Sequence, residues 1–472
     1  MITKHTRLFF IILCLTGTFN ILGAQVVIKG TDSTYSGDKI SFYKYKDKIT
    51  ETETLVAEAT FDSTGKFELA FNVDETTFVF AYLGVYKVHL YVEPDKTYIV
   101  VLPPKEEKSI QDKLNPYYQY IVIHLGTEDY LEGELNTLIR MFNDAYLPYY
   151  NKHLMDAAIK KDFPELDKDI ERMDKPFQSY DNKYFEDYRK FRYVMLRHLS
   201  SQQKSRKVAA EYFEGGEVLY NNLAYMEMFD LIFEGYLMFF ARTDKGKKIH
   251  EDIGESKSYR ELKKTLLKDD IFGSDELLEL VLVKGIQDEC YDDNFSRESL
   301  IIILDSIISQ TNYQKIKEIG SNVKAKTTKL LVGYEPPEFE LKDVNGELVK
   351  LDDFKGKYVY LNFCACYSYT CLNEFAILQN LYDKHKDKLE IVTVIADEDI
   401  EVLPKFLSKN NYNWHFLHFG NQPWILKEYD IRAYPTYYLV GPDGKLLMSP
   451  APAPRENFEG QLFKVMRSKG DL

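Results

Sequence analysis

Hydrophobic and polar residues follow three successive patterns along the chain, and the first has the period of two that is typical of strands. Residues 39–45, 77–82 and 88–92 are rich in β-branched and aromatic side chains. Turn residues separate such runs, as in the Asp-Ser-Thr-Gly sequence at 62–65. Because no helical pattern intervenes, we predict a small β-sandwich over residues 25–104.

The second pattern, over residues 105–331, places apolar residues three and four apart, which is the period of an amphipathic helix. The runs 188–199 and 221–242 contain no proline. Run 221–242 is apolar around most of a helical circumference, so we predict one buried helix there. This region is predicted to be all-α.

The third pattern, over residues 332–472, alternates strands and helices. Residues 358–363 and 389–395 are almost wholly apolar strands, and 372–385 is a helix between them. A Gly-Pro-Asp-Gly turn at 441–444 follows a further strand at 436–440. This order predicts an α/β sheet covered by helices, as the last domain of a multidomain protein.

The first 24 residues have the pattern of a secretory signal. Lys4 and Arg7 precede the apolar run 8–15, and Leu-Gly-Ala at 22–24 is a suitable cleavage end. Two alternatives stay open, which are retention of this segment as a membrane anchor and lipoprotein processing at Cys14. We expect cleavage and export to the periplasm. No later segment has the roughly 20 apolar residues that a membrane span needs.

The net negative charge of the chain limits the classes of molecule that it is expected to bind. The chain has 60 basic and 74 acidic residues, and removal of the signal segment would make it more acidic still. Such a chain repels phosphate backbones, and no basic stripe interrupts the acidic excess. Nucleic-acid binding is therefore disfavoured, and the residues indicate no cofactor.

Four cysteines remain after signal cleavage, and three of them lie close together. Cys290 is isolated in the helical region and is expected to be structural. Cys364, Cys366 and Cys371 fall within eight residues in the third region. In an exported protein with few cysteines, such a cluster indicates thiol chemistry.

Residues 333–465 resemble the thioredoxin fold of the exported TlpA/ResA-like thiol-disulfide oxidoreductases. The resemblance rests on motifs in a fixed order, which are Pro-Pro-Glu-Phe at 336–339, Asp-Val-Asn-Gly at 343–346, the run 351–363, and Tyr-Pro-Thr at 434–436 within 429–445. The two preceding regions resemble, less specifically, the accessory part of larger bacterial members. The family implies disulfide exchange through a Cys-x-x-Cys pair.

The active motif departs from the family pattern. Against Asn-Phe-Trp-Ala-x-Trp-Cys-x-x-Cys, this chain reads Asn-Phe-Cys-Ala-Cys-Tyr-Ser-Tyr-Thr-Cys at 362–371. Ser368 therefore takes the place of the attacking cysteine, whereas Cys371 keeps that of the resolving one. A serine hydroxyl does not ionise at neutral pH and cannot form a mixed disulfide. We expect Ser368 to cap the helix by accepting a hydrogen bond from the Cys371 backbone, rather than to act as a catalytic serine.

Two further readings of the cysteine cluster stay open. Cys366 or Cys364 could pair with Cys371 as an unconventional redox couple, which requires Cα atoms within about 7 Å. Alternatively, the three thiols and a histidine, His415 or His418, could bind a soft metal such as Cu(I). The spacing matches no closed zinc site.

Pro435 occupies the place of the family's cis-proline. The family implies that Tyr434, just before it, offers its backbone to an extended peptide, and Tyr367 replaces an active-site tryptophan. The expected partner is an extended peptide or protein, including a protein disulfide or dithiol. The leading hypothesis is weak or altered redox activity. The alternative is a binding module that exchanges no disulfides.

Overall fold

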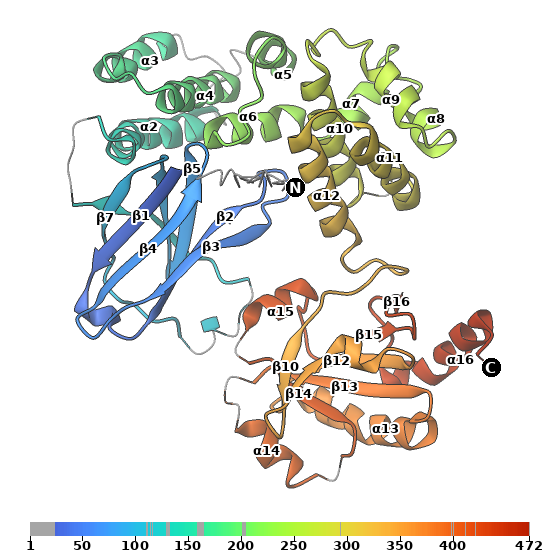
Figure 1. The fold of residues 1–472 in the computed structure, drawn as a ribbon. Helices are drawn as coiled ribbons and strands as arrows, with labels where there is room; N and C mark the ends of the chain where they lie inside the picture. Colours follow the sequence, from blue (N-terminus) through green and yellow to red (C-terminus); the bar gives the residue numbers. More distant parts are fainter. Residues whose placement is uncertain are drawn as a thin grey trace, which may run out of the picture.

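The computed structural model describes residues 24–471, apart from 110–111, 114, 116, 129–132, 158–164, 201–203, 293, 398, 400, 411 and 421. The predicted signal segment, except its last residue Ala24, lies outside the described residues. Figure 1 shows β-strands and a layer of helices in one half of the molecule and a separate α/β lobe in the other. The chain is therefore multidomain.

The N-terminal strands form two sheets, ordered β4-β1-β7-β9 and β3-β2-β5-β6-β8. One cluster of buried side chains contains residues of both sheets, such as Val26 from the first and Phe42 from the second. Alternate residues of β4 are buried, as the period of two predicts. The strands are β1 Ala24–Thr31, β2 Lys39–Tyr45, β3 Glu53–Thr60, β4 Lys66–Val73, β5 Thr77–Leu83, β6 Tyr86–Val92, β7 Thr97–Val101, β8 Ile121–His124 and β9 Gly126–Thr127.

The last two of these strands correct the sequence-based interpretation. Strand β8 pairs with β6 and β9 pairs with β7, although residues from 105 onward were expected to be helical. The prediction of an all-α region is therefore wrong for residues 121–127. These strands have four and two residues, too few for a period of two to stand out.

The central region is helical from residue 135. Its helices are α2 Leu135–Ala157, α3 Leu166–Asp174, α4 Lys183–Leu199, α5 Ser205–Val208, α6 Leu223–Phe233, α7 Tyr236–Ala241, α8 Ile249–Gly254, α9 Tyr259–Leu266, α10 Asp275–Glu289, α11 Arg297–Gln310 and α12 Gln314–Thr328. The prediction of one helix over 221–242 is wrong. Gly235 adopts a left-handed conformation with φ of 59° and separates α6 from α7, while both helices stay largely buried.

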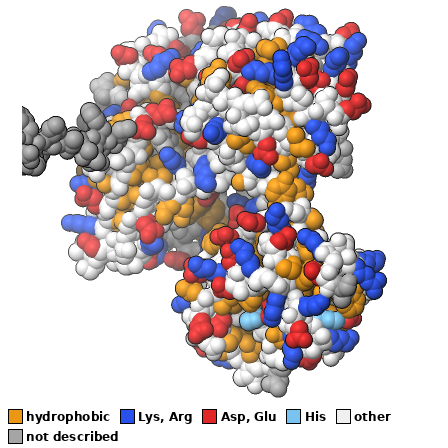
Figure 2. Space-filling model, turned by 45° about the vertical axis from the view of Figure 1, so that its right-hand side comes forward, with side chains coloured by type: hydrophobic (Ala, Val, Ile, Leu, Met, Phe, Trp, Pro, Cys, Tyr) orange, Lys and Arg blue, Asp and Glu red, His pale blue; other side chains and the backbone are white. Residues whose placement is uncertain are grey.

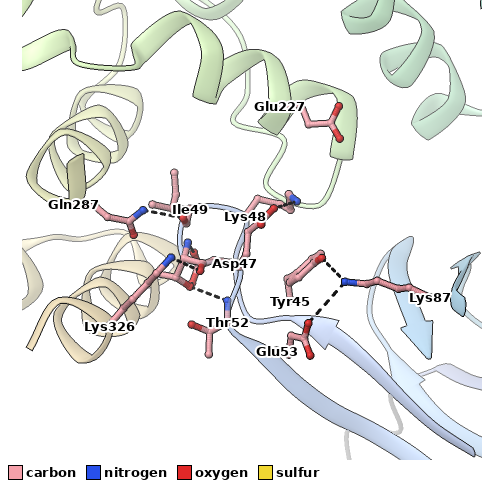
Figure 3. A network of polar contacts seen from close by, with 12 residues as sticks. Tyr45, Asp47, Lys48, Ile49, Thr52, Glu53, Lys87, Glu227, Gln287 and Lys326 are labelled. Carbon is pink, nitrogen blue, oxygen red and sulfur yellow. Dashed lines mark hydrogen bonds and ion pairs between the residues drawn. The ribbon is translucent and has the colours of Figure 1, made fainter. Parts of the chain in front are cut away.

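The turn between β2 and β3 joins the strands to the helices, as Figure 3 shows. Ile49 at its tip is buried in the core of the helical region. Its carbonyl accepts a hydrogen bond from Gln287 of α10 at 3.0 Å, and Lys326 of α12 donates to the Thr50 carbonyl at 2.7 Å. The two N-terminal regions are thus connected by packing as well as by the chain.

The C-terminal domain contains a seven-stranded sheet ordered β11-β10-β14-β13-β12-β15-β16. Side chains of α13 and α16 pack on one face of the sheet, and those of α15 pack on the other. The strands are β10 Glu340–Asp343, β11 Leu348–Lys350, β12 Tyr358–Cys364, β13 Leu389–Ile395, β14 His415–His418, β15 Thr436–Val440 and β16 Leu446–Met448. The helices are α13 Tyr369–His385, α14 Val402–Leu407, α15 Pro423–Glu428 and α16 Phe458–Lys469. The predicted α/β order is confirmed.

This domain contacts the rest of the chain through polar groups. Tyr117 donates a hydrogen bond to Asp430 at 2.6 Å, and Lys329 pairs with Glu428 at 3.2 Å. On the face shown in Figure 2, acidic and basic side chains are interspersed over both halves of the molecule. Among the described residues, no helix is long and apolar enough to cross a bilayer.

Candidate functional site

Strand β12 carries the first cysteine of the cluster into the centre of the domain. It lies between β13, to which it runs parallel, and β15, to which it runs antiparallel, and all seven of its residues are buried. A strand covered on both faces needs such a continuous apolar run. Cys364 is its last residue and is 0% exposed. The thiol therefore lies at the carboxyl end of a central strand.

The chain turns from β12 into α13 within four residues. The Ser368 N–H donates to the Ala365 carbonyl at 3.0 Å, which closes this turn. The Ser368 hydroxyl then accepts a hydrogen bond from the backbone N–H of Cys371 at 3.4 Å. The predicted helix cap is confirmed. Cys371 lies in the first turn of α13 and is 0% exposed.

The turn brings the thiols of Cys364 and Cys371 together. The hydrogen bond from the Cys364 thiol lowers the pKa of Cys371 to about 7, against the opposing effect of burial. The Ser368 hydroxyl and the Ala365 N–H also stabilise the Cys371 thiolate. Burial and the neighbouring Cys371 raise the pKa of Cys364. Of the two, Cys371 is therefore the one that ionises, and Cys364 keeps its proton.

The proton of Cys364 has a second acceptor, because Asn362 Oδ1 lies 3.2 Å from its sulfur. Asn362 is itself held by Thr393, whose hydroxyl oxygen accepts from the Asn362 amide at 2.9 Å. Hydrogen bonds to a charged acceptor are stronger than those to a neutral one. Ionisation of Cys371 therefore favours the bond from Cys364 to Cys371.

Cys366 has a different environment. Its backbone N–H donates to the carboxylate of Asp397 at 2.7 Å, and its side chain is also hydrogen-bonded to that carboxylate. Burial and Asp397 together raise the pKa of Cys366 to about 12. Of the two proposed partners for Cys371, the structure brings Cys364 into hydrogen-bond contact and engages Cys366 with Asp397.

The two histidines that were candidate ligands of a soft metal bind other groups of the domain. His415 lies 3.3 Å from Glu390, and His418 shares a hydrogen bond with the Asp397 carbonyl at 2.7 Å. The other ring nitrogen of His418 accepts from the Gly420 N–H at 3.0 Å. Within the described part of the chain, no group of three histidine, cysteine or acidic side chains is arranged to hold a metal.

Tyr434 and Pro435 lie beside the thiol pair. Their peptide bond is cis, which confirms the conformation implied by the family. Tyr434 packs against the buried cluster that contains Cys364 and Cys371, and burial raises its pKa. Tyr367 is 67% exposed at the rim. Their role in binding a peptide stays a prediction.

Sequence reasoning missed two polar side chains on the helix side of the thiol pair. Glu374, one turn after Cys371, is 1% exposed and pairs with Arg455 through one oxygen. Its other oxygen and the hydroxyl of Tyr437 are buried without a hydrogen-bond partner among the described residues. The spacing of three from Cys371 was the available signal for Glu374. No local pattern marked Tyr437.

Asp397 was missed as well. It lies two residues after the end of the buried strand β13, which runs parallel to β12, so its side chain is at the same edge of the sheet as Cys364. Burial raises the pKa of Asp397. A polar residue at the carboxyl end of a parallel strand was the signal that could have found it.

This geometry separates the thiols by accessibility as well as by charge. Cys371 has the stabilised thiolate, but it lies behind Ser368 and is fully buried. Cys366 is partly exposed, but its thiol holds its proton tightly. Disulfide exchange with a protein needs a thiolate that the partner's sulfur can reach. In the described residues of this site, neither cysteine has both properties.

Comparisons with known proteins match part of the chain. Residues 332–448 match the model of the AhpC/TSA family. Thiol-disulfide oxidoreductase ResA of Bacillus cereus is 30% identical over 172 residues, which cover 36% of this chain and 94% of the relative. ResA of Bacillus subtilis is 29% identical over 154 residues, which cover 32% of this chain and 82% of that relative.

Solved structures are similar to part of the chain. The thioredoxin domain of a thiol-disulfide oxidoreductase from Bacteroides vulgatus is 26% identical, covers 28% of this chain and 97% of that chain, and has a TM-score of 0.27. A thiol:disulfide interchange protein from Bacteroides sp. is 27% identical, covers 29% of this chain and 90% of that chain, and has a TM-score of 0.26.

Proposed function

The chain belongs, through its C-terminal domain, to the TlpA/ResA-like family of thioredoxin-fold thiol-disulfide oxidoreductases, and from this premise we propose that its redox activity is altered. Ser368 holds the place of the attacking cysteine. Protein disulfides are then poor substrates, because the thiolate that remains cannot reach them. Residues 1–24 direct export to the periplasm, and the β-sandwich and helical regions position the domain or recruit its partner.

One observation carries this proposal. The hydroxyl of Ser368 caps α13 at the position where the family has its nucleophile, and Cys371 behind it is 0% exposed. A mixed disulfide requires a partner sulfur to approach the attacking sulfur in line. With Cys371 0% exposed, its sulfur is not open to that approach.

The test is the reduction of a protein disulfide, such as that of insulin, by the wild type and by Ser368→Cys. The wild type is expected to be nearly silent. The variant places a cysteine at the N-terminus of α13, three residues before Cys371, and should be well above the wild type. Cys366→Ala serves as the matched control and should be as silent as the wild type.

Two results would contradict the proposal in different ways. Strong wild-type activity that Cys366→Ala abolishes would make Cys366 the nucleophile. A folded Ser368→Cys variant without any gain would show that the surroundings have also lost the chemistry.

A second candidate function is a binding module without exchange chemistry, favoured by exposed aromatic side chains at the site. Tyr367 and Tyr369 are 67% and 78% exposed, and Leu372 in the first turn of α13 is 37% exposed. Exposed apolar clusters mark interaction sites. Thiol counts with and without reductant separate the two functions, because a pure binder keeps all three cluster thiols unchanged under both conditions.

A further inference from the structure

A groove lies at the junction of the β-sandwich and the helical region. Figure 3 shows the turn after β2 beside α12, and Asn322 of α12 donates a hydrogen bond to Asp47 of this turn at 2.8 Å. The groove, of about 450 Å³, lies between the end of β2 and the first half of α12. A deeper cavity of about 170 Å³ adjoins it, since Lys44, Lys46 and Glu318 line both.

Unpaired lysines dominate the charged lining of this groove. Lys44, Lys46 and Lys317 line it together with one acidic residue, Glu318, and Lys315 lines the adjoining cavity. All four lysines are exposed, and none forms an ion pair or a side-chain hydrogen bond with a described residue. In a chain with 60 basic and 74 acidic residues, the fold thus gathers uncompensated positive charge at one place. Such a place attracts an anionic ligand.

The acidic residues nearby do not cancel this charge in the groove. Glu318 accepts a hydrogen bond from Gln314 at 2.9 Å. Asp47, Asp74 and Glu75 line only the deeper cavity, where they balance its lysines. The groove is therefore net positive, and the deeper cavity is close to neutral.

The spacing of the lysines fits an extended ligand. Lys44 and Lys46 are alternate residues of one segment and line the same groove, so their Cα atoms lie about 7 Å apart. Carboxylates at alternate positions of an extended peptide repeat at the same distance. A long polyanion would also meet the net negative surface of the rest of the chain and be repelled, whereas a short acidic segment meets only the lysines.

The deeper cavity adds an apolar contact. Its lining includes the side chains of Val73, Phe78, Leu223, Met226 and Ile319. A cavity of about 150 Å³ holds a ring of the size of benzene, so this one accepts one large apolar side chain.

We propose that the groove binds a short, extended acidic segment of a partner protein. Its carboxylates pair with Lys44, Lys46 and Lys317, and a neighbouring apolar side chain enters the deeper cavity. This inference gives the chemistry of the partner that the proposed function assigns to the β-sandwich and helical regions, and it rests on that function to this extent. It does not depend on disulfide exchange in the C-terminal domain.

The experiment measures binding of the purified protein to the peptide Phe-Val-Glu-Val-Glu-Val-Glu, labelled with fluorescein at its C-terminus, by fluorescence anisotropy. Binding is expected to weaken as sodium chloride is added, because salt screens exposed charges. The same peptide with Gln in place of each Glu should bind at least about tenfold more weakly, since it loses three ion pairs. The peptide with Ala in place of Phe should also bind more weakly, because it leaves the deeper cavity empty.

Two double variants locate the bound peptide. Lys44→Gln with Lys46→Gln should weaken binding by about tenfold, as the loss of two exposed ion pairs implies. Lys247→Gln with Lys248→Gln is the matched control, because both residues are exposed lysines outside the two cavities and the net charge changes equally. This control should bind the peptide as the wild type does. Circular dichroism checks that both double variants are folded.

Several results would overturn the proposed groove. These are no binding of the glutamate peptide, equal binding of the glutamine peptide, or an equal loss in both double variants. Binding of anionic phospholipid vesicles or of short polyphosphate, without binding of the peptide, would assign the groove to another ligand. Each can occur while the wild type remains silent toward insulin, so the groove can fail without the proposed redox function. Strong insulin reduction by the wild type would instead contradict that function, whatever the groove binds.

Discussion

The hydroxyl oxygen of Ser368 lies 3.4 Å from the backbone nitrogen of Cys371 and accepts its hydrogen bond. The same hydroxyl stabilises the Cys371 thiolate. One side chain thus satisfies an amide at the start of α13 and lowers the pKa of a thiol beside it. The residue that replaces the family's nucleophile keeps two structural roles at the site.

Ser368→Ala should therefore have two measurable effects. Loss of the cap should lower the free energy of unfolding by about 1 kcal/mol, measured by chemical denaturation. Loss of the hydroxyl should also raise the pKa of Cys371, measured by thiolate absorbance. Ser274→Ala is the matched control, since Ser274 caps α10 by accepting from Leu277 at 3.2 Å, far from any thiolate. Ser274→Ala should lower the free energy of unfolding without changing the pKa of Cys371. An unchanged Cys371 pKa in Ser368→Ala would contradict the second role of Ser368.

His89 makes the N-terminal region sensitive to acid. Burial, with a contribution from His124, lowers the pKa of His89 to about 3, and its Nδ1 is buried without a hydrogen-bond partner among the described residues. The unfolded chain binds a proton near pH 6.5, whereas the folded chain stays neutral until about pH 3. The contribution of neutral His89 to the free energy of unfolding is therefore full above pH 6.5. It is lost as the pH falls below that value, by about 2 kcal/mol at pH 5.

Thermal unfolding between pH 7 and pH 4.5 measures this effect. His89→Phe keeps a ring against Phe78 and should flatten the loss of Tm with acid. His250→Phe is the control, because His250 is exposed and should leave the pH dependence as in the wild type. An equally steep loss in His89→Phe would show that other groups cause the acid sensitivity.

Residues 333–472 are expected to fold alone. The buried residues of both clusters of this domain lie between Phe339 and Met466, and the partly buried Leu330, which packs against one of them, lies just outside the fragment. A fragment that starts at 333 keeps the hydrogen bonds between Gly333, Tyr334 and Leu446. Urea denaturation should give one cooperative transition. A fragment that starts at 340 lacks these bonds and should be less stable, whereas a molten 333–472 fragment would contradict the domain boundary.

The parts of the fold that the sequence predicted are those in which local pattern and burial coincide. Strand β13 has the predicted bounds because all seven of its residues are buried, and the Ser368 cap follows from the chemistry of one side chain. The break at Gly235 was not predicted, because the apolar run continues across it. Local hydrophobicity gives no sign that one residue will adopt a left-handed conformation.

The candidate site was predicted in its residues but not in their pairing. The sequence placed Cys364, Cys366 and Cys371 together and left open which one meets Cys371. The choice depends on the turn closed by Ser368 and Ala365, and on the hydrogen bond between Cys366 and Asp397, which lies in the loop after β13. These are tertiary contacts, which the spacing of cysteines does not encode.

The ionisation of the Cys371 thiol is a property of the site that can be measured directly. Its pKa is lowered to about 7, whereas burial holds the pKa of Cys364 well above the usual range and that of Cys366 at about 12. Absorbance at 240 nm should therefore show one thiol of this cluster ionising between pH 5 and 9. Because the unfolded thiol ionises near pH 8.5, this contribution to stability is full above that value. It is lost as the pH falls through 7, and amounts to at most about 2 kcal/mol.

Removal of the hydrogen bond that causes this shift should move the midpoint. A bond to a charged acceptor contributes about 1.5–3 kcal/mol, so Cys364→Ala should raise the midpoint by about one to two pH units. Cys366→Ala is the control and should leave it near 7, since the Cys366 thiol is engaged with Asp397. A wild-type midpoint near 8.5, or one that Cys364→Ala does not change, would show that Cys364 does not hold the Cys371 thiolate.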